Sequence, residues 1–222
     1  MLTLGIDEAG RGPCIGSMFI TGTLFEEDQL EKLKKIGVRD SKLLTHKRRV
    51  ELAEKIKRIA KAIKTIEVKP SEIDDAVNGN NSLNLNWLEA IKQADIINEL
   101  NPHRVIIDCP SPNIGAYTNF LKKYIRKDLL NKIELIVRHK ADRDFIECSS
   151  SSIIAKVTRD MKIDELKKKY GDFGSGYPSD PDTVRFLRNN WKKYPEIFRK
   201  SWESYKRLGE KKESLLSFIR KL

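Results

Sequence analysis

The feature that most constrains this 222-residue chain is its opening stretch, where an apolar segment leads into two adjacent carboxylates and a glycine-rich turn. Residues 1–6 have the character of a buried strand, and Asp7 and Glu8 stand where that strand ends. Gly10 and Gly12 let the peptide N–H groups of the turn approach a ligand closely. Strand ends of an open α/β sheet form its usual ligand-binding edge. The stretch therefore predicts functional chemistry there, with a solvated turn as the alternative unless further acids join the pair.

The composition indicates a globular protein, with 39% hydrophobic and 34% charged residues. No apolar run approaches the roughly 20 residues of a membrane span, and the amino terminus lacks the layout of a signal peptide. We therefore expect a cytoplasmic protein without a membrane segment. The cysteines are three and widely spaced, which argues against a disulfide framework or a zinc site. Small buried side chains are expected at Cys14, Cys109 and Cys148.

Strand and helix patterns alternate along most of the chain. After the opening strand, further strands are predicted over residues 15–25, 62–68, 104–108 and 132–137. Helices are predicted over residues 26–36, 46–60, 71–77, 83–100, 113–126 and 146–170, the last with an inner face that runs from Ile146 to Met161. This alternation favours an α/β fold with a central five-stranded mixed sheet flanked by helices.

The chain after the long helix has a different character. A glycine-rich loop follows residue 170, and Asp180 is placed to cap a helix with Pro181 in its first turn. Further helices are predicted near residues 194–199 and from about residue 202. We therefore divide the chain into a core of residues 1–170 and a small C-terminal helical subdomain of residues 171–222.

Positive charge is concentrated in that subdomain. The chain has a net charge of +11, and most of it comes from the residues after 183, where Trp and Tyr are interspersed with Lys and Arg. A basic surface with aromatic side chains is typical of contact with a nucleic-acid phosphate backbone. The alternative is a helical face whose charges only keep the protein in solution.

Two more acids stand at predicted strand ends. Asp108 ends the fourth strand and Asp142 follows the fifth, so a central sheet could gather Asp7, Glu8, Asp108 and Asp142 into one cluster. Clustered carboxylates repel one another unless divalent cations neutralise them, and oxygen ligands favour Mg²⁺ or Mn²⁺ over zinc. Two such ions roughly 4 Å apart can activate a water molecule for phosphodiester hydrolysis. Asp108 alone could equally be a turn-forming acid.

Six motifs, in order over nearly the whole chain, are specific when taken together. They are Gly5-Ile6-Asp7-Glu8-Ala9-Gly10-Arg11-Gly12-Pro13, Asp40-Ser41-Lys42-Leu43-Leu44, Ile107-Asp108, His139-Lys140-Ala141-Asp142, Ser152-Ile153-Ile154-Ala155-Lys156-Val157 with Arg159-Asp160, and Gly174-Ser175-Gly176-Tyr177-Pro178-Ser179-Asp180-Pro181. The sequence resembles the type 2 ribonuclease H family, ribonuclease HII, in its archaeal form. One departure is Ser17, where the family pattern usually has a second proline, and it affects only the local turn.

The resemblance implies an RNase H-like fold with a catalytic domain over residues 1–170. It implies an endonuclease that hydrolyses the RNA strand of RNA–DNA hybrids and cuts 5′ of single ribonucleotides in duplex DNA, leaving 3′-hydroxyl and 5′-phosphate ends. Such an enzyme removes misincorporated ribonucleotides and RNA primers. By motif, Asp7, Glu8, Asp108 and Asp142 are the catalytic, metal-binding acids of a two-metal site for Mg²⁺ or Mn²⁺. The substrate-binding residues would be Gly10, Arg11, Gly12, Ser41, Lys42, Lys156 and Tyr177.

Several residues have simpler readings from position alone. Lys156 could be a solvated helix lysine, and Tyr177 an ordinary loop anchor. Trp87 and Trp191 are expected to pack rather than to stack on bases. His139, close to Asp142, could assist proton transfer or serve the structure.

Two other functions stay open from sequence. A different metal-dependent nuclease of the same fold would share the acids without distinguishing ribose from deoxyribose, and a noncatalytic hybrid-binding module would tolerate their loss. We expect a monomer. A sliding clamp is an open question as a further partner, because the apolar residues near the carboxyl end could pack either on a clamp or into the core. These residues are Leu215, Leu216 and Phe218.

Overall fold

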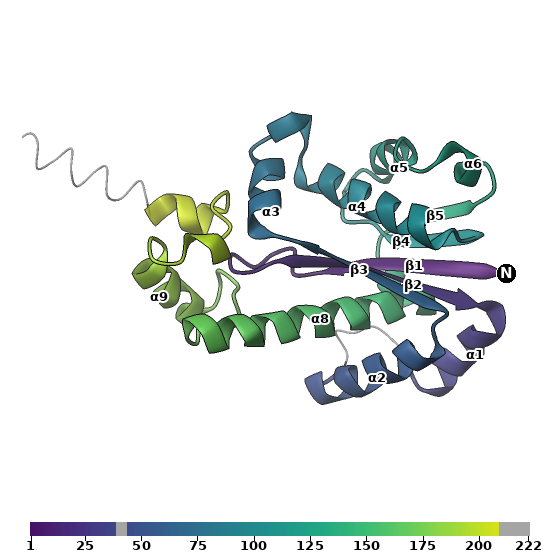
Figure 1. Ribbon diagram of the computed structural model, residues 1–222, viewed down its shortest axis with the longest axis horizontal. Helices are drawn as coiled ribbons and strands as arrows, with labels where there is room; N and C mark the ends of the chain where they lie inside the picture. The colour runs from purple at the N-terminus through teal and green to yellow at the C-terminus, as the bar shows by residue number, and fades with distance from the viewer. Residues whose placement is uncertain (39–43, 209–222) are drawn as a thin grey trace, which may run out of the picture.

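A five-stranded mixed sheet forms the centre of the protein, which is seen here in a computed structural model that describes residues 1–38 and 44–208. The strand order is β3-β2-β1-β4-β5. The central strand pairs antiparallel with β2 and parallel with β4 (Figure 1). The strands are β1 (Leu2–Ala9), β2 (Met18–Glu26), β3 (Ala62–Val68), β4 (Arg104–Asp108) and β5 (Glu134–Arg138).

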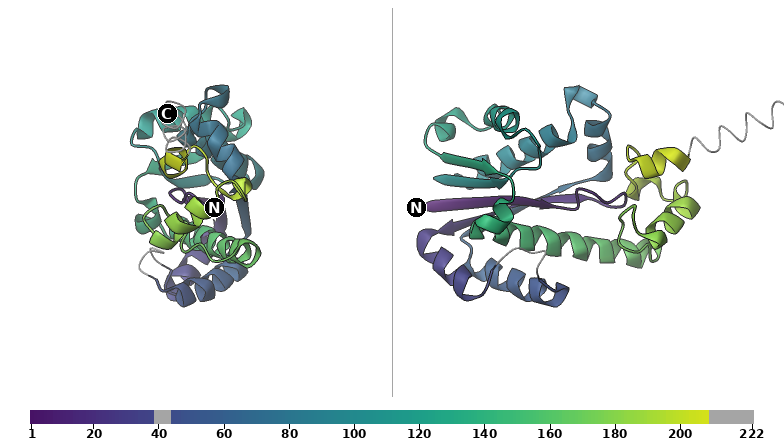
Figure 2. Two further views of the ribbon diagram at one scale, coloured as in Figure 1. Left: turned by 90° about the vertical axis from the view of Figure 1, so that its left-hand side faces the viewer. Right: turned by 180° about the vertical axis from the view of Figure 1, so that it is seen from behind.

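Helices cover both faces of this sheet. On one face lie α3 (Pro70–Val77), α4 (Leu85–Leu100), α5 (Ile114–Lys122) and α6 (Lys127–Leu130). On the other lie α1 (Glu27–Lys35), α2 (His46–Ile59) and the 25-residue α8 (Ile146–Tyr170) (Figures 1 and 2). Further helical segments are the short α7 (Ala141–Asp144), α9 (Pro181–Asn190), the 3₁₀ turns η2 (Asn80–Ser82) and η3 (Pro195–Ile197), and residues 203–208.

The predicted order of strands and helices up to residue 170 is confirmed, with shifted ends that have local causes. The second strand begins at Met18, because Gly16 has a φ of 83° and Ile15 forms an isolated bridge with Phe198 instead. The helix predicted from residue 83 begins after Asn84, whose side chain accepts a hydrogen bond from Trp87 N (3.0 Å). The helix predicted over residues 113–126 ends already at Lys122 as α5, and the separate short helix α6 follows from Lys127.

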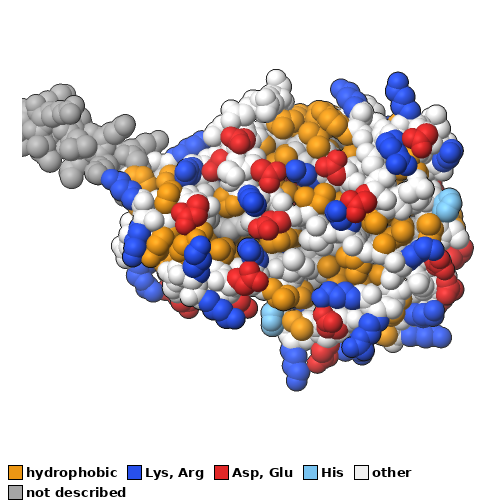
Figure 3. All heavy atoms as spheres, in the orientation of Figure 1, with side chains coloured by type: hydrophobic (Ala, Val, Ile, Leu, Met, Phe, Trp, Pro, Cys, Tyr) orange, Lys and Arg blue, Asp and Glu red, His pale blue; other side chains and the backbone are white. Residues whose placement is uncertain are grey.

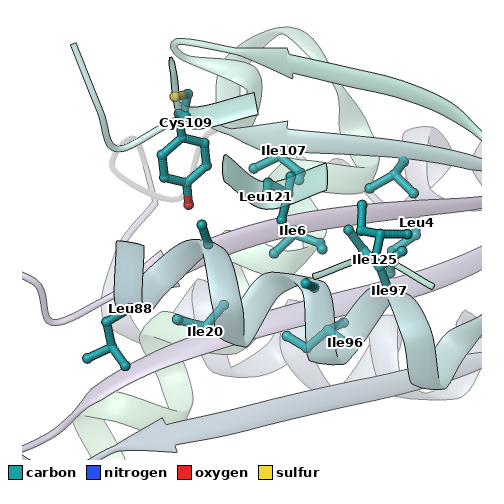
Figure 4. Packing of buried hydrophobic residues seen from close by; sticks show 14 of the residues in the cluster. Leu4, Ile6, Ile20, Leu88, Ile96, Ile97, Ile107, Cys109, Leu121 and Ile125 are labelled. Atoms are coloured by element: carbon teal, nitrogen blue, oxygen red, sulfur yellow. The ribbon is translucent and has the colours of Figure 1, made fainter. Parts of the chain in front are cut away.

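The larger hydrophobic core lies between α4 and the sheet. Ile96 and Ile97 of α4 pack over Leu4 and Ile6 of β1, together with Ile107 of β4 (Figure 4). All five of these side chains are fully buried. Burying apolar area of this kind is the main favourable term in folding. The core therefore holds β1 and β4 side by side, which matters for the acids at their ends.

On the opposite face, α8 approaches the sheet so closely that only glycine fits beneath it. A Cβ at Gly5 would lie 2.5 Å from Cys148 N and would overlap the Glu147 carbonyl group. Ser151 Oγ donates a hydrogen bond to the Gly5 carbonyl oxygen (2.8 Å). This contact sets the distance between α8 and the central strand.

Two expectations were wrong. Residues 194–199 do not form a helix beyond the turn η3, because Phe198 and Arg199 bind in extended form against residues 14–16. Met161, predicted on the inner face of the long helix, is 58% exposed.

The C-terminal part packs on the core through a separate apolar cluster. Phe173, Leu187 and Phe198 join Ile15 and Ile163 in this cluster. Asp180 caps α9 by accepting a hydrogen bond from Asp182 N (2.9 Å), as predicted. Residues 203–208 are helical, which agrees with a helix after residue 202. The division at residue 170 stays a prediction.

Charged residues of both signs cover the surface. On the face shown in Figure 3, Lys and Arg alternate with Asp and Glu rather than forming one patch. The three cysteines are buried and unpaired, as expected. Among the described residues, no helix combines the length and the apolarity that crossing a membrane requires.

Replacing Gly5 by alanine tests the close approach of α8. We expect Gly5→Ala to lower the free energy of unfolding by roughly 3 kcal/mol, because the added methyl group must displace the α8 backbone. Gly115→Ala in α5 is the matched control, since its Cβ meets only Asn113 Oδ1 at 3.6 Å. Chemical denaturation measures both. Equal stabilities of the two variants would contradict the close-approach explanation.

Candidate active site

Three aspartates from distant parts of the chain meet at one edge of the sheet. Ile6 of β1 pairs with Ile107 of β4 in parallel register, so Asp7 and Asp108 come next on neighbouring strands. Asp142 comes from α7, just after the adjacent parallel strand β5. One carboxylate oxygen of each aspartate lies within 4.8 Å of the other two. The predicted convergence of these three acids is confirmed.

Strand alternation explains why the fourth predicted acid stands apart. Successive side chains point to opposite faces of a strand. Asp7 follows the parity of Gly5 and faces α8, where Ser152 donates a hydrogen bond to its carboxylate. Glu8 follows the parity of Ile6 and faces the α4 side. It lines the same pocket but is not part of the group of three.

The loop before α7 is shaped to present Asp142. Lys140 has a left-handed backbone (φ 60°), which turns the chain back toward the sheet directly after β5. Ala141 N then donates a hydrogen bond to Asp108 Oδ1 (3.0 Å). Ser149 Oγ of α8 donates to the Asp142 carbonyl oxygen (2.5 Å). These bonds join the ends of β4 and α7 to the first turn of α8.

Burial and mutual repulsion raise the pKa of the acids on β1. The pKa of Asp7, which is only 5% exposed, is raised well above its usual value, first by burial and then by Glu8 and Asp108. The pKa of Glu8 is raised to about 8, first by burial and then by Glu89 of α4. Carboxylates that are unfavourable as isolated charges are stabilised as anions by a bound cation.

The donor set suits a hard divalent cation. Within the described residues the group of three contains carboxylate oxygens only, and Glu8 Oε2 nearby is buried without a hydrogen-bond partner. Mg²⁺ and Mn²⁺ prefer oxygen ligands, whereas zinc sites use histidine and cysteine more often.

The acids form one wall of a pocket of about 330 Å³. The turn of residues 10–12, called here the glycine loop, forms another wall. The rest of the pocket is lined by Tyr177, Lys156, Arg49 and Ser152. The structure therefore brings together the predicted acids, the glycine loop, Lys156 and Tyr177. Ser41 and Lys42 lie outside the described residues.

Tyr177 packs directly on the glycine loop. A Cβ at Gly12 would lie 3.3 Å from the Tyr177 ring, so glycine leaves the room in which the ring sits. The guanidinium of Arg159 lies over the Tyr177 ring, 5.4 Å from the ring centroid. Arg159 Nη2 also donates a hydrogen bond to the Ser175 carbonyl oxygen (2.8 Å). Tyr177 is 36% exposed, which leaves part of its ring open to a ligand.

The side chain of Arg11 is engaged with α4. It forms a salt bridge with Glu89, which is fully buried, and its Nη2 donates to Asn86 Oδ1 (2.7 Å). The pKa of Glu89 is nevertheless raised to about 7, because burial outweighs the opposing effect of Arg11. The guanidinium thus fixes the glycine loop to α4, and the backbone of the loop is left as its means of contacting a ligand.

Basic residues on the pocket wall are held by one acid. Lys156 Nζ lies 2.7 Å from Asp160 Oδ1, and Arg49 Nη2 lies 3.9 Å from Asp160 Oδ2. Sequence reasoning missed Arg49, since a basic residue in a basic helix carries no distinguishing signal. It also missed Glu89 and the hydrogen bond of Ser152. His139 Nε2 lies 2.8 Å from the Ser111 carbonyl oxygen, and this bond gives the ring a structural role.

Comparison with known proteins identifies the family of the chain. The family model of Ribonuclease HII matches residues 4–205. Ribonuclease HII of Pyrococcus furiosus is 42% identical over 209 residues, which cover 93% of this chain and 90% of that protein. The crystal structure of ribonuclease H2 from Pyrococcus horikoshii OT3 superposes with a TM-score of 0.85 at 38% identity, covering 95% and 98% of the two chains.

A second solved structure, the complex of PCNA with RNase HII from Archaeoglobus fulgidus, matches with a TM-score of 0.79 at 33% identity, covering 93% of this chain and 96% of that one. The family expected from the sequence motifs and its RNase H-like fold are confirmed. By the span and the identity of these matches, the chain belongs to the ribonuclease HII family of endonucleases.

Proposed function

We propose that this endonuclease hydrolyses the RNA strand of RNA–DNA hybrids and cuts on the 5′ side of single ribonucleotides in duplex DNA. The products are a 3′-hydroxyl and a 5′-phosphate, and the cellular role is removal of misincorporated ribonucleotides and RNA primers. The observation that carries the proposal is one pocket that joins the aspartate group to the glycine loop and Tyr177. The acids suit hydrolysis, and the loop and the tyrosine suit recognition of a ribose.

In this proposal Asp7, Glu8, Asp108 and Asp142 hold Mg²⁺ or Mn²⁺. A pair of such ions would supply an activated water molecule and stabilise the leaving oxygen. The protein's own contribution is to keep the acids in place. Ser152 and the Glu8 amide N–H, which donates to Asp7 Oδ1 (2.8 Å), orient Asp7, while Ala141 N orients Asp108.

Ribose recognition is assigned to the glycine loop and Tyr177. A 2′-hydroxyl can both donate and accept a hydrogen bond, and it is the group by which a protein tells RNA from DNA. Peptide N–H groups of the glycine loop are suited to bind it, since Gly12 has no side chain to obstruct them. Tyr177 would pack on the adjoining deoxyribose with the exposed part of its ring.

Phosphate contacts are assigned to the basic wall of the pocket. Lys156 and Arg49 both line the pocket, so both can reach a backbone phosphate. Ser41 and Lys42 keep the same assignment on the resemblance of their motif alone. The C-terminal subdomain of residues 171–222 would extend the contact, and Arg185 of α9 has a side chain that is 72% exposed.

We also propose a sliding clamp as a partner. Support comes from the relative of A. fulgidus, which was solved as a complex with PCNA. The apolar residues that sequence analysis named for this contact, Leu215, Leu216 and Phe218, lie outside the described residues.

Removing one metal-binding charge should abolish cleavage. We expect Asp7→Asn and Asp108→Asn each to lower turnover of a single-ribonucleotide duplex by about a hundredfold or more, because a weakened ion stabilises the reaction less. Asp144→Asn is the matched control, since Asp144 lies on α7 beside Asp142 but outside the group of three. Near-parental turnover of either site variant at saturating Mg²⁺ would make its assignment wrong.

The same variants have a readout that needs no catalysis. Mg²⁺ should raise the melting temperature of the parent, because it neutralises carboxylates that repel one another. Asp7→Asn should melt at a higher temperature than the metal-free parent, since a buried charge beside Glu8 and Asp108 is gone, and should gain less from Mg²⁺. Thermal denaturation with and without Mg²⁺ measures both effects.

Tyr177 should matter most where a single ribonucleotide positions the substrate. Tyr177→Ala is expected to lose about tenfold more activity on duplex DNA with one ribonucleotide than on a long hybrid, because only the former depends on one junction. Tyr177→Phe keeps the ring and should retain most activity. Equal losses on both substrates would indicate a purely structural tyrosine, and cleavage of all-DNA duplex at a comparable rate would favour a general nuclease.

Clamp binding can be tested separately from catalysis. Removal of residues 209–222 should abolish co-elution with a sliding clamp in gel filtration and leave cleavage of short substrates unchanged. Undiminished co-elution after the truncation would show that residues 209–222 are not the clamp-binding site.

A further inference from the structure

Side chains of residues 199–202 donate hydrogen bonds to all three carbonyl oxygens of the glycine loop. Arg199, whose side chain is fully buried, donates from Nη2 to the Gly10 oxygen (2.5 Å) and from Nη1 to the Arg11 oxygen (2.7 Å). Trp202 Nε1 donates to the Gly12 oxygen (3.2 Å). The donors lie 188 to 190 residues further along the chain than the oxygens they bind.

These bonds also determine where the loop's N–H groups point. A trans peptide is planar, so the N–H of one residue points opposite to the carbonyl of the residue before it. Because the Gly10 and Arg11 carbonyls point at Arg199, the N–H groups of Arg11 and Gly12 point away from it. The glycine loop lines the pocket that contains the acids. Arg199 therefore orients the N–H groups that suit a 2′-hydroxyl, by binding the carbonyl oxygens on the opposite side of the loop.

The arginine matches this task in shape. Its Nε donates to the Gly16 oxygen (3.0 Å), so the planar fork spans three carbonyl groups at once. A lysine has the charge without the fork. Burial lowers the pKa of Arg199 to about 10. A buried cation is costly unless it is hydrogen-bonded, and here the three carbonyl oxygens accept bonds from the guanidinium and so compensate its burial.

The segment that carries Arg199 is itself held firmly. Asp74 of α3 accepts hydrogen bonds from Lys200 N (2.9 Å), Ser201 N (2.8 Å) and Ser201 Oγ (2.6 Å). The Arg199 guanidinium lies 5.0 Å from the centre of the Trp202 ring. Segment and loop therefore form one unit with α3.

We propose that Arg199 and Trp202 are positioning residues for ribose discrimination. Arg199 holds the Gly10 and Arg11 carbonyl oxygens so that the N–H groups of Arg11 and Gly12 face the substrate. Trp202 binds the Gly12 oxygen, which precedes Pro13 and therefore has no paired N–H, and so fixes the end of the loop. This inference rests on the proposed function, in which the loop recognises the 2′-hydroxyl. It adds two residues that touch neither the reacting phosphate nor the cations.

Binding measurements in an uncleaving background test the inference. All variants carry Asp7→Asn, and the dissociation constants are measured for two duplexes that differ only in one ribonucleotide. The parent should prefer the ribonucleotide duplex. Arg199→Lys should reduce that preference about tenfold, roughly the value of one well-placed hydrogen bond, with little change in affinity for the all-DNA duplex. Trp202→Phe, which removes the Nε1 donor but keeps an aromatic ring beside Arg199, should reduce it about threefold.

The control and the outcomes separate the two proposals. Arg126→Lys changes an exposed arginine that bonds Asn101 and should leave the preference unchanged. No preference in the parent would overturn the proposed function, whatever the variants do. A parental preference that both folded variants retain, or an equal loss of affinity for both duplexes, would overturn the positioning role. If Arg199→Lys does not fold, an unchanged preference in Trp202→Phe overturns it.

Discussion

Three carboxylates that repel one another are held within 4.8 Å at one edge of the sheet, and the rest of the structure keeps them there. The parallel pairing of β1 with β4 sets Asp7 beside Asp108, and α7 adds Asp142. A raised pKa at Asp7 shows that the folded chain bears an electrostatic cost at this point. The apolar core between α4 and the sheet offsets that cost, and a divalent cation would remove it.

Close approach between elements is the second constraint. Gly5 admits the backbone of α8 against the central strand, and Gly12 admits the ring of Tyr177 against the loop. A side chain at Gly5 would overlap the α8 backbone, whereas one at Gly12 would crowd the Tyr177 ring and require a small shift of it. The first sets the distance from which Ser152 reaches Asp7, and the second lets Tyr177 line the pocket beside the glycine loop. The same property of glycine thus serves the fold and the site.

Much of this was predictable from local sequence. The strand over Ala62–Val68 and the strand over Arg104–Asp108 have the predicted ends, because alternating or β-branched runs and flanking prolines mark them. The cap at Asp180 was equally readable, since a capping side chain acts within three residues. The failure at residues 194–199 has the opposite cause. There Phe198 and Arg199 bind to residues 14–16, and no local pattern records a partner that far away.

The sequence by itself determined the strands, the acids that follow them and, by its motifs, the family. Hydrophobic periodicity and turn-forming residues are local features, so they can be recognised from the sequence alone. Only the tertiary structure decided that Glu8 stands apart from the three aspartates, that Arg11 binds Glu89 and that Arg199 holds the glycine loop. These are choices of face and partner between residues as many as 189 positions apart, and they are settled only when sheet pairing and helix packing place the elements together.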